Sequence, residues 1–328
     1  EMRGRGDQRT WNRPLGCAAV VGRRWAKAIG DNGPVTTPPE KRPNLIDEHA
    51  AELVEVAIEV AQRAAAHVRV RRPELFGAAS PPAADAIRTK SAPTDPVTVA
   101  DTEAEEVIRA ELARLRPGDD VLGEEGGGSR EVPSGIRWVV DPIDGTVNFL
   151  YGIPAYAVSV AAQIDGRSVA GAVVDVARER TYHAAAGWGA FVTDAHGTVA
   201  LHASAAADPA LALVATGFAY SAQRRREQAR ILGELLPQVR DIRRIGAAAL
   251  DLCLVAEGAV DAHYEHGLSP WDWAAGGLIA AEAGALVITP PAGSRSDAGE
   301  VTVAIAPALA ASLRALLDDC GALDPLPI

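Results

Sequence analysis

Cysteine, lysine and long apolar runs are all scarce in this sequence of 328 residues. The three cysteines, Cys17, Cys253 and Cys320, stand far apart and indicate neither a disulfide framework nor a cysteine metal site. This scarcity favours a protein of the reducing cytoplasm. Because no run of about 18 apolar residues occurs, we expect no membrane-spanning helix and no membrane partner.

Positive charge is also in deficit, because 32 Lys and Arg face 43 Asp and Glu and give a net charge of −11. Nucleic acid is therefore an unexpected partner, since its phosphates are bound by excess basic residues. Residues 1–43 differ, with nine basic against four acidic residues, a net of +5, and no sustained period. We predict a disordered basic extension over 1–43 and a catalytic domain over 44–328. The domain divides into an α+β part over roughly 44–200 and an α/β part over roughly 201–328.

Hydrophobic periodicity predicts a mixture of helices and strands after residue 43. Long amphipathic helices are expected at 45–71 and 98–115, and an Asp-Gly pair at 165–166 indicates a hairpin turn. Strands are expected at 120–123, 136–140, 155–164, 167–176, 180–184, 189–192, 211–215, 259–264, 285–288 and 301–306. Further helices are expected at 222–236, 246–256, 270–283 and 308–320. Such mixing is typical of layered α/β or α+β packing.

One stretch, Trp138–Phe149, combines an apolar strand pattern with two carboxylates, Asp141 and Asp144. Carboxylates at the end of a buried strand are costly unless something neutralises them. A hard divalent cation with oxygen ligands is the usual partner. Gly145 and Thr146 follow at once and predict a turn into a short helix, whose free amides bind phosphate. The stretch alone therefore indicates a metal-assisted phosphate site.

Acidic residues recur in three other suggestive settings. Glu124 follows a predicted strand in a glycine-rich turn, Asp272 begins an apolar helix, and Asp101 leads into the helix at 98–115. Each has a plain structural explanation, because acids at helix starts serve as caps or dipole partners and Glu124 suits an ordinary turn. The paired carboxylates Asp141 and Asp144 have no such simple explanation.

Four sequence blocks resemble, in their order and residue pattern, those of the inositol monophosphatase superfamily of metal-dependent, lithium-sensitive sugar phosphatases. The resemblance is strongest to its bacterial inositol-1-monophosphatase branch. The matching blocks are Lys90–Asp101, Gly123–Glu125, Trp138–Phe149 and Trp271–Gly276. The resemblance runs from about Leu45 to the C-terminus. The preference for Arg over Lys and the high Ala content also suggest a GC-rich genome, as in actinobacteria.

The resemblance implies a set of Mg²⁺ ligands. Glu124, Asp141 and the backbone carbonyl of Ile143 would hold a first ion. Asp141, Asp144 and Asp272 would hold a second, and Glu124 with waters would help to hold a weaker third. Oxygen-only ligands suit Mg²⁺, whereas the seven histidines show no paired helical spacing, which disfavours zinc.

The resemblance also implies catalytic roles. Thr146 with Asp101 would orient and deprotonate a metal-activated water, helped by Glu124 as a metal ligand, and the amides of Gly145 and Thr146 would hold the phosphate. Metal ions neutralise phosphoryl charge and lower the pKa of bound water, which fits direct water attack. Asp141 as a covalent nucleophile is the competing mechanism, but bridging two metals would occupy it.

Substrate contacts come from other segments. The resemblance places Glu265 against the hydroxyls of an inositol and Ala248 in the same pocket, and a carboxylate suits a polyol because it accepts from two hydroxyls. Lys90, the only lysine after residue 43, would lie near the metals through water. Arg243 and Arg244 fit either a contact with sugar or neighbour or an exposed basic pair. Val147 is apolar where nucleotide and histidinol phosphate enzymes tend to be basic, which favours inositol phosphate.

These features together predict a Mg²⁺-dependent phosphoric monoester hydrolase with two or three ions per site, acting on myo-inositol 1-phosphate. Histidinol phosphate, fructose 1,6-bisphosphate and an adenosine bisphosphate are alternative substrates of the same chemistry. A regulatory protein that binds RNA polymerase is the alternative of a different class. The fold implied is an α+β protein, a layered α-β-α-β-α sandwich of the sugar-phosphatase type. It is often dimeric in the family, so we expect a homodimer.

Overall fold

The computed structural model describes residues 45–77, 87–89 and 96–328, with side chains from His49. These residues belong to one compact unit, Pro43–Ile328. Two predictions, the disordered extension over 1–43 and the site role of Lys90, lie outside the described residues. Within the described part, no helix is long and apolar enough to cross a membrane.

The larger sheet has seven strands in the order β3-β4-β5-β6-β7-β8-β9, and only the β3–β4 pair is parallel. Its strands are β3 Asp120–Gly123, β4 Ile136–Asp144, β5 Ala157–Ile164, β6 Arg167–Asp175, β7 Arg180–Ala185, β8 Ala190–Asp194 and β9 Gly197–Ala200. The predicted hairpin turn joins β5 to β6, with positive φ at both Asp165 and Gly166. Positive φ at both central residues is the requirement of a type I′ turn.

The smaller sheet has five strands in the order β11-β10-β12-β14-β13. Its strands are β10 Leu213–Thr216, β11 Asp241–Arg243, β12 Ala262–His266, β13 Leu286–Ile288 and β14 Val301–Ile305. The β10 strand runs parallel to β11 and β12, whereas β14 is antiparallel to β12 and β13. Two short strands, β1 Ile87–Thr89 and β2 Pro96–Thr98, form a separate antiparallel pair.

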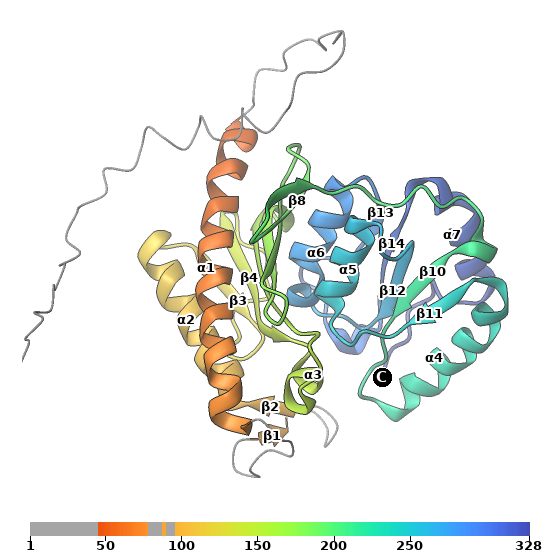
Figure 1. The fold of residues 1–328 in the computed structure, drawn as a ribbon, viewed down its shortest axis with the longest axis horizontal. Coiled ribbons are helices and arrows are strands. Elements are labelled where there is room, and N and C mark those ends of the chain that lie inside the picture. Colours follow the sequence, from red (N-terminus) through yellow and green to blue (C-terminus); the bar gives the residue numbers. More distant parts are fainter. Residues whose placement is uncertain (1–44, 78–86, 90–95) are drawn as a thin grey trace, which may run out of the picture. The chain divides into compact units, whose positions relative to one another are not determined.

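Helices alternate with the two sheets in layers (Figure 1). They are α1 Leu45–Phe76, α2 Val99–Leu115, α3 Thr146–Tyr151, α4 Ala222–Leu235, α5 Ala248–Glu257, α6 Pro270–Glu282 and α7 Ala310–Asp319. Helices α1 and α2 pack on one face of the larger sheet, and α5 and α6 lie between the sheets. Helices α4 and α7 share a core with the outer face of the smaller sheet. The predicted α-β-α-β-α sandwich is confirmed.

The β4 strand shows why its sequence is apolar without alternation. Trp138 and Val140 belong to the core under α1 and α2, whereas Val139 belongs to the core under α5 and α6. Successive side chains of a strand point to opposite faces, and here both faces are covered. The β4 strand is therefore buried on both sides, and it ends in the carboxylates of the candidate site.

Most predicted elements are present with ends shifted by a few residues, but three differences have physical causes. The first helix continues past Arg71 to Phe76, whose ring packs edge-on against Phe149. Strand β4 extends to Asp144 rather than ending at Val140. Strands β9 and β11 were not predicted, because β9 is exposed at all four residues and β11 is only three residues long. An exposed or very short strand carries no hydrophobic pattern.

Candidate active site

A β-bulge brings Asp141 and Asp144 to the same side of β4. Asp141 pairs with Ser159 and Asp144 with Ala157, so the register shifts between the two pairs. Residues three apart on a regular strand point to opposite faces, and one extra residue in the strand reverses this parity. Pro142 has no N–H to donate. It stands within the irregular segment, where no hydrogen bond between strands requires one.

Asp272 joins this pair from the first turn of α6. One carboxylate oxygen from each of Asp141, Asp144 and Asp272 lies within 4.8 Å of the others. The same Asp272 carboxylate accepts a hydrogen bond of 2.6 Å from the Ser269 amide in a capping box. Asp272 is therefore both a helix cap and a neighbour of the other two carboxylates.

Backbone amides orient the two carboxylates of β4. The Ile143 amide donates to Asp141 Oδ1 at 3.0 Å. Two amides at the start of α5 donate to Asp144, Ala248 N to Oδ1 at 3.2 Å and Ala249 N to Oδ2 at 2.7 Å. Helix N-termini present free N–H groups and favour negative charge. The start of α5 therefore holds Asp144 in place.

Burial makes the cluster electrostatically costly without a cation. Burial, together with the nearby Glu124 carboxylate, raises the pKa of Asp144 to about 7, against the lowering effect of the Ala249 and Ala248 amides. Burial, together with Glu124 and Asp144, raises the pKa of Asp272 well above its usual value. Crowded buried carboxylates hold protons unless a cation compensates them. An oxygen-only donor set of this kind fits Mg²⁺.

Glu124 is held near this cluster by a turn that depends on a buried acid of α2. Glu105, 2% exposed, accepts hydrogen bonds from the Glu125 amide at 2.7 Å and the Gly126 amide at 2.9 Å. Arg109 Nε donates to the same carboxylate at 2.7 Å. A Cβ at Gly123 would overlap Glu105, so only glycine fits there. Nothing in the sequence pattern marks Glu105 for this role, because acidic residues are common in the early turns of helices.

Thr146 and Asp101 form a direct pair beside the cluster. Thr146 Oγ1 lies 3.1 Å from Asp101 Oδ1 and 3.0 Å from the Ile143 carbonyl oxygen. The fully buried Asp101 uses Oδ2 to accept from Thr98, at 2.8 Å from its amide and 2.5 Å from its hydroxyl. Asp101 is therefore a helix-cap partner and a partner of Thr146 at once. A threonine hydroxyl has one proton and two acceptor positions, so Thr146 can also accept a hydrogen bond.

Gly145 supplies the left-handed residue from which α3 begins. Its φ is +91°, and a Cβ there would lie 2.9 Å from the Ala155 carbonyl and 3.1 Å from Ala247 Cβ. A side chain would thus meet both strain and steric conflict. Asn148 fixes the helix by donating to the carbonyls of Ala155 at 2.8 Å and Ile245 at 2.9 Å. The sequence analysis did not select Asn148, because a lone amide in a short helix gives no signal.

The predicted substrate residues lie on neighbouring elements. Glu265 stands on β12 with its side chain 13% exposed, and a Cβ at Gly217 would overlap its carboxylate. The positive charge of Arg244 lowers the pKa of Glu265, although burial raises it to about 7. Ala248 begins α5 and gives its amide to Asp144. Arg243 pairs with Asp241 at 2.6 Å, as an exposed basic residue does.

Comparisons with known proteins agree with this geometry. A family model described as the inositol monophosphatase family matches residues 49–322. An inositol-1-monophosphatase of Mycobacterium bovis is 54% identical over 288 residues, which cover 86% of this chain and 98% of the relative. The structure of Mycobacterium tuberculosis SuhB superposes with a TM-score of 0.71 at 48% identity, over 84% of this chain and 99% of that one.

Not all similar proteins carry the same name. A Nus factor SuhB of Pasteurella multocida is 38% identical over 200 residues, covering 61% of this chain and 73% of the relative. The family match extends over most of the chain and includes Glu124, Asp141, Asp144 and Asp272. It confirms the predicted family and the predicted class, a phosphatase. The chain belongs to the inositol monophosphatase family.

Proposed function

We propose that this chain is a Mg²⁺-dependent phosphatase that converts myo-inositol 1-phosphate to myo-inositol and phosphate. One observation carries the proposal. The buried Asp141 and Asp144 carboxylates and the half-buried Asp272 carboxylate converge within 4.8 Å, and the Thr146–Asp101 pair is joined to the same strand end through the Ile143 carbonyl. A cation site beside an activated hydroxyl is the arrangement that hydrolysis of a phosphate ester by water requires.

Two or three ions would share these ligands. Glu124, Asp141 and the Ile143 carbonyl would hold the first, Asp141, Asp144 and Asp272 the second, and Glu124 would help with a third. Bound Mg²⁺ would neutralise the phosphoryl charge and make water a better nucleophile. The placement of Asp144 by two α5 amides supports this assignment, because a fixed carboxylate loses little entropy when it binds.

The Thr146 hydroxyl would position the attacking water. When the Ile143 carbonyl binds a cation, Asp101 Oδ1 remains as the acceptor for the Thr146 proton. The lone pairs of Thr146 would then accept a hydrogen bond from water, and Asp101 would take the proton. Asp141 is less suited to be a covalent nucleophile, because its Oδ1 already accepts from Ile143 N and it is only 1% exposed.

Different segments would hold the phosphate and the polyol. The amides of Gly145 and Thr146 open α3 and would hold the phosphate. Glu265 and the wall beginning at Ala248 would contact the inositol hydroxyls. Gly217 supports this role, because its lack of a side chain leaves room for the carboxylate that would accept two hydroxyls. A water-mediated contact from Lys90 also belongs to the proposal.

A substrate panel tests the proposal. Released phosphate would be measured with Mg²⁺ or with EDTA on myo-inositol 1-phosphate, histidinol phosphate, fructose 1,6-bisphosphate and an adenosine bisphosphate. We expect the highest kcat/KM for the inositol ester and no turnover in EDTA. Faster turnover of another ester would overturn the substrate, and turnover in EDTA would overturn the metal chemistry.

The second candidate is a regulatory protein that binds RNA polymerase, and it is kept because the Pasteurella multocida relative is named a Nus factor and not a phosphatase. Purified polymerase would be titrated with the wild-type chain and with Asp144→Asn. Equal binding by both, combined with full phosphatase activity of the wild type, would show two separable functions. Binding without any phosphatase activity would replace the proposed function.

The remaining expectations are included in the proposal. We propose a cytoplasmic, lithium-sensitive homodimer whose catalytic domain spans 44–328. The buried free thiols of Cys253 and Cys320 support a reducing compartment. Light scattering would measure the dimer, and a LiCl titration at fixed Mg²⁺ would measure the inhibition. Removing residues 1–43 is expected to leave kcat/KM near normal.

A further inference from the structure

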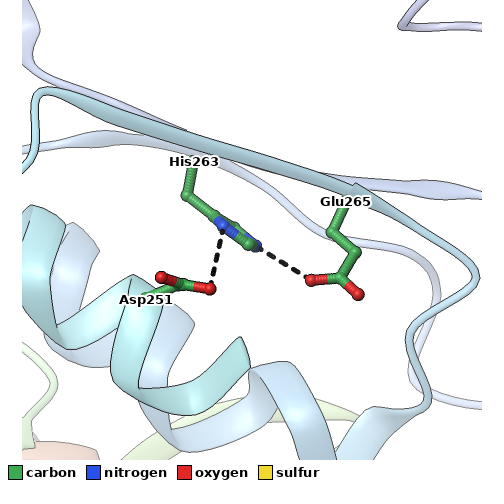
Figure 2. A group of neighbouring side chains, drawn as sticks. All are labelled: Asp251, His263 and Glu265. Carbon is green, nitrogen blue, oxygen red and sulfur yellow. Dashed lines mark ion pairs between the residues drawn. The ribbon is translucent and has the colours of Figure 1, made fainter. Parts of the chain in front are cut away.

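A second group of metal-ligating side chains lies between α5 and β12. His263 and Glu265 are two apart on β12, so both point to the same face of the strand, and Asp251 reaches them from α5 (Figure 2). One ligand atom from each of the three residues lies within 4.8 Å of the others. His263 is fully buried and Asp251 is 1% exposed.

The polar atoms of this group are poorly satisfied. His263 Nδ1 lies 4.0 Å from Asp251 Oδ2, and His263 Nε2 lies 4.0 Å from Glu265 Oε2, both beyond hydrogen-bond range. Neither ring nitrogen of His263, nor Asp251 Oδ1, has a hydrogen-bond partner among the described residues. An unpaired buried polar atom destabilises the folded protein, so such atoms usually have a partner.

Burial also sets the charge state that a cation would meet. It lowers the pKa of His263 to about 3, so the imidazole is neutral and has a lone pair to give. Burial, together with the Glu265 charge, raises the pKa of Asp251 well above its usual value. Arg244 lowers the pKa of both carboxyls, yet burial still dominates in each. A divalent cation would compensate both carboxylates at once.

We propose that Asp251, His263 and Glu265 form a second cation site, distinct from the oxygen-only cluster, that takes a borderline divalent metal such as Zn²⁺. Three protein ligands of mixed nitrogen and oxygen type, with a fourth position left for water, are a common zinc arrangement. Asp251 faces Nδ1 of His263 and Glu265 faces Nε2, whereas an imidazole binds one metal ion through one nitrogen. Binding of a single ion therefore requires the imidazole and one carboxylate to turn toward a shared nitrogen, as well as a closure of about 1 Å to the roughly 3.3 Å spacing of tetrahedral zinc ligands. Mg²⁺ prefers oxygen ligands and is expected to bind here weakly.

Occupation of this site would inhibit the enzyme. This consequence rests on the proposed function, in which Glu265 accepts the hydroxyls of the substrate. A metal on Glu265 would take away that acceptor and compete with the polyol. The site itself does not depend on the identity of the substrate.

Binding is tested without reference to activity. The full chain in excess Mg²⁺ would be titrated with Zn²⁺ by calorimetry and with Co²⁺ by visible absorption. We expect one Zn²⁺ equivalent that Mg²⁺ does not displace, and a Co²⁺ spectrum of a four- or five-coordinate site. His263→Gln should lose this equivalent, whereas His266→Gln, which removes another buried histidine of β12, should keep it.

Three results would overturn the site: no Zn²⁺ binding in excess Mg²⁺, equal binding by wild type and His263→Gln, or loss in Asp144→Asn alone. If His263→Gln fails to fold, Asp251→Asn and Glu265→Gln provide the same comparison. In the activity assay, Zn²⁺ should raise KM for the inositol ester, and His263→Gln should raise the inhibitory Zn²⁺ concentration at least ~10-fold. A Co²⁺ site without phosphatase activity would refute the proposed function and leave the site intact.

Discussion

The two clusters of carboxylates in this molecule are neighbours, but they differ in how hydrogen bonds hold their side chains. Asp141, Asp144 and Asp272 each accept a hydrogen bond from a backbone amide, whereas Asp251 and His263 face one another across 4.0 Å. Helix α5 serves both, because its first amides hold Asp144 and its Asp251 side chain faces His263. The difference indicates that the first cluster is preorganised for an oxygen-seeking ion. The second needs a ligand to draw its side chains together.

The strongest test of this difference between the clusters is to remove one carboxylate from each. Asp144→Asn should lower kcat/KM for the inositol ester at least ~10³-fold, because a metal ligand is lost at the reacting phosphate. Asp251→Asn should have a much smaller effect at saturating Mg²⁺. The exposed Asp318→Asn is the control and should match the wild type. Equal losses in Asp144→Asn and Asp251→Asn would mean that both clusters serve one reaction.

The second-largest difference that we expect between the clusters is in the pH dependence of magnesium binding. The pKa of Asp144 is raised to about 7, so its contribution to the stability of the metal-free protein is present at low pH and is lost as the pH rises through about 7. Mg²⁺ must displace that proton and the proton that burial also retains on Asp272, whose pKa is raised well above its usual value. The gain in unfolding free energy on adding Mg²⁺ should therefore grow by at least about 1.4 kcal/mol per pH unit as the pH rises toward 7.

Urea unfolding in EDTA and in excess Mg²⁺, between pH 5 and pH 8, measures this gain as a difference. Because the buried histidines contribute equally with and without Mg²⁺, they cancel. Asp144→Asn should flatten the dependence and His263→Gln should not. A gain that does not change with pH would contradict the assignment of Asp144 as a ligand.

The Thr146–Asp101 pair belongs to the first cluster alone. Thr146→Ala should lower kcat by about 10²-fold with little change in KM, since it removes proton transfer rather than binding. Thr146→Ser keeps the hydroxyl 3.1 Å from Asp101 and should recover most of the rate. A rate for Thr146→Ala within a few-fold of the wild type would exclude Thr146 from the proton path.

The smallest expected effect tests the turn that holds Glu124. Glu105→Gln keeps the shape of the side chain but weakens its acceptance from the Glu125 and Gly126 amides. The Mg²⁺ concentration for half-maximal rate should rise by about 10-fold, with kcat at saturating Mg²⁺ retained. The exposed neighbour variant Glu106→Gln should leave the Mg²⁺ titration unchanged. A lower kcat at all Mg²⁺ concentrations would indicate damage beyond the turn.

Local sequence patterns predicted those parts of the site that lie within one segment. The apolar run before Asp141 predicted a buried strand, and Gly145-Thr146 predicted the start of α3. The family resemblance brought Glu124 and Asp272 to the same place. The two helix-start acids, Asp101 and Asp272, proved to be caps as well as cluster neighbours, so the simple and the functional explanations are compatible.

What the sequence did not predict depends on contacts between distant segments. The amides of Ala248 and Ala249 meet Asp144 across more than a hundred residues, and no periodicity encodes such a pair. None of the histidines is paired at the His-x-x-x-His spacing of a helical site, and His263 carries no such signal because its neighbours in the cluster lie two residues along a strand and on a separate helix. The role of Glu105 was not predicted for the same reason, since the turn that it binds lies 20 residues further along the chain.

The position of Asp272 on α6 has a consequence for synthesis. A nascent chain that has released β4 and α5 presents Asp141 and Asp144 but not their third partner. Domains fold as units once their residues have left the ribosome, so the three proposed magnesium ligands come together only when α6 has docked between the sheets. With the ligand set that we propose, prematurely terminated chains would lack phosphatase activity, and tight magnesium binding would report that translation has passed through α6.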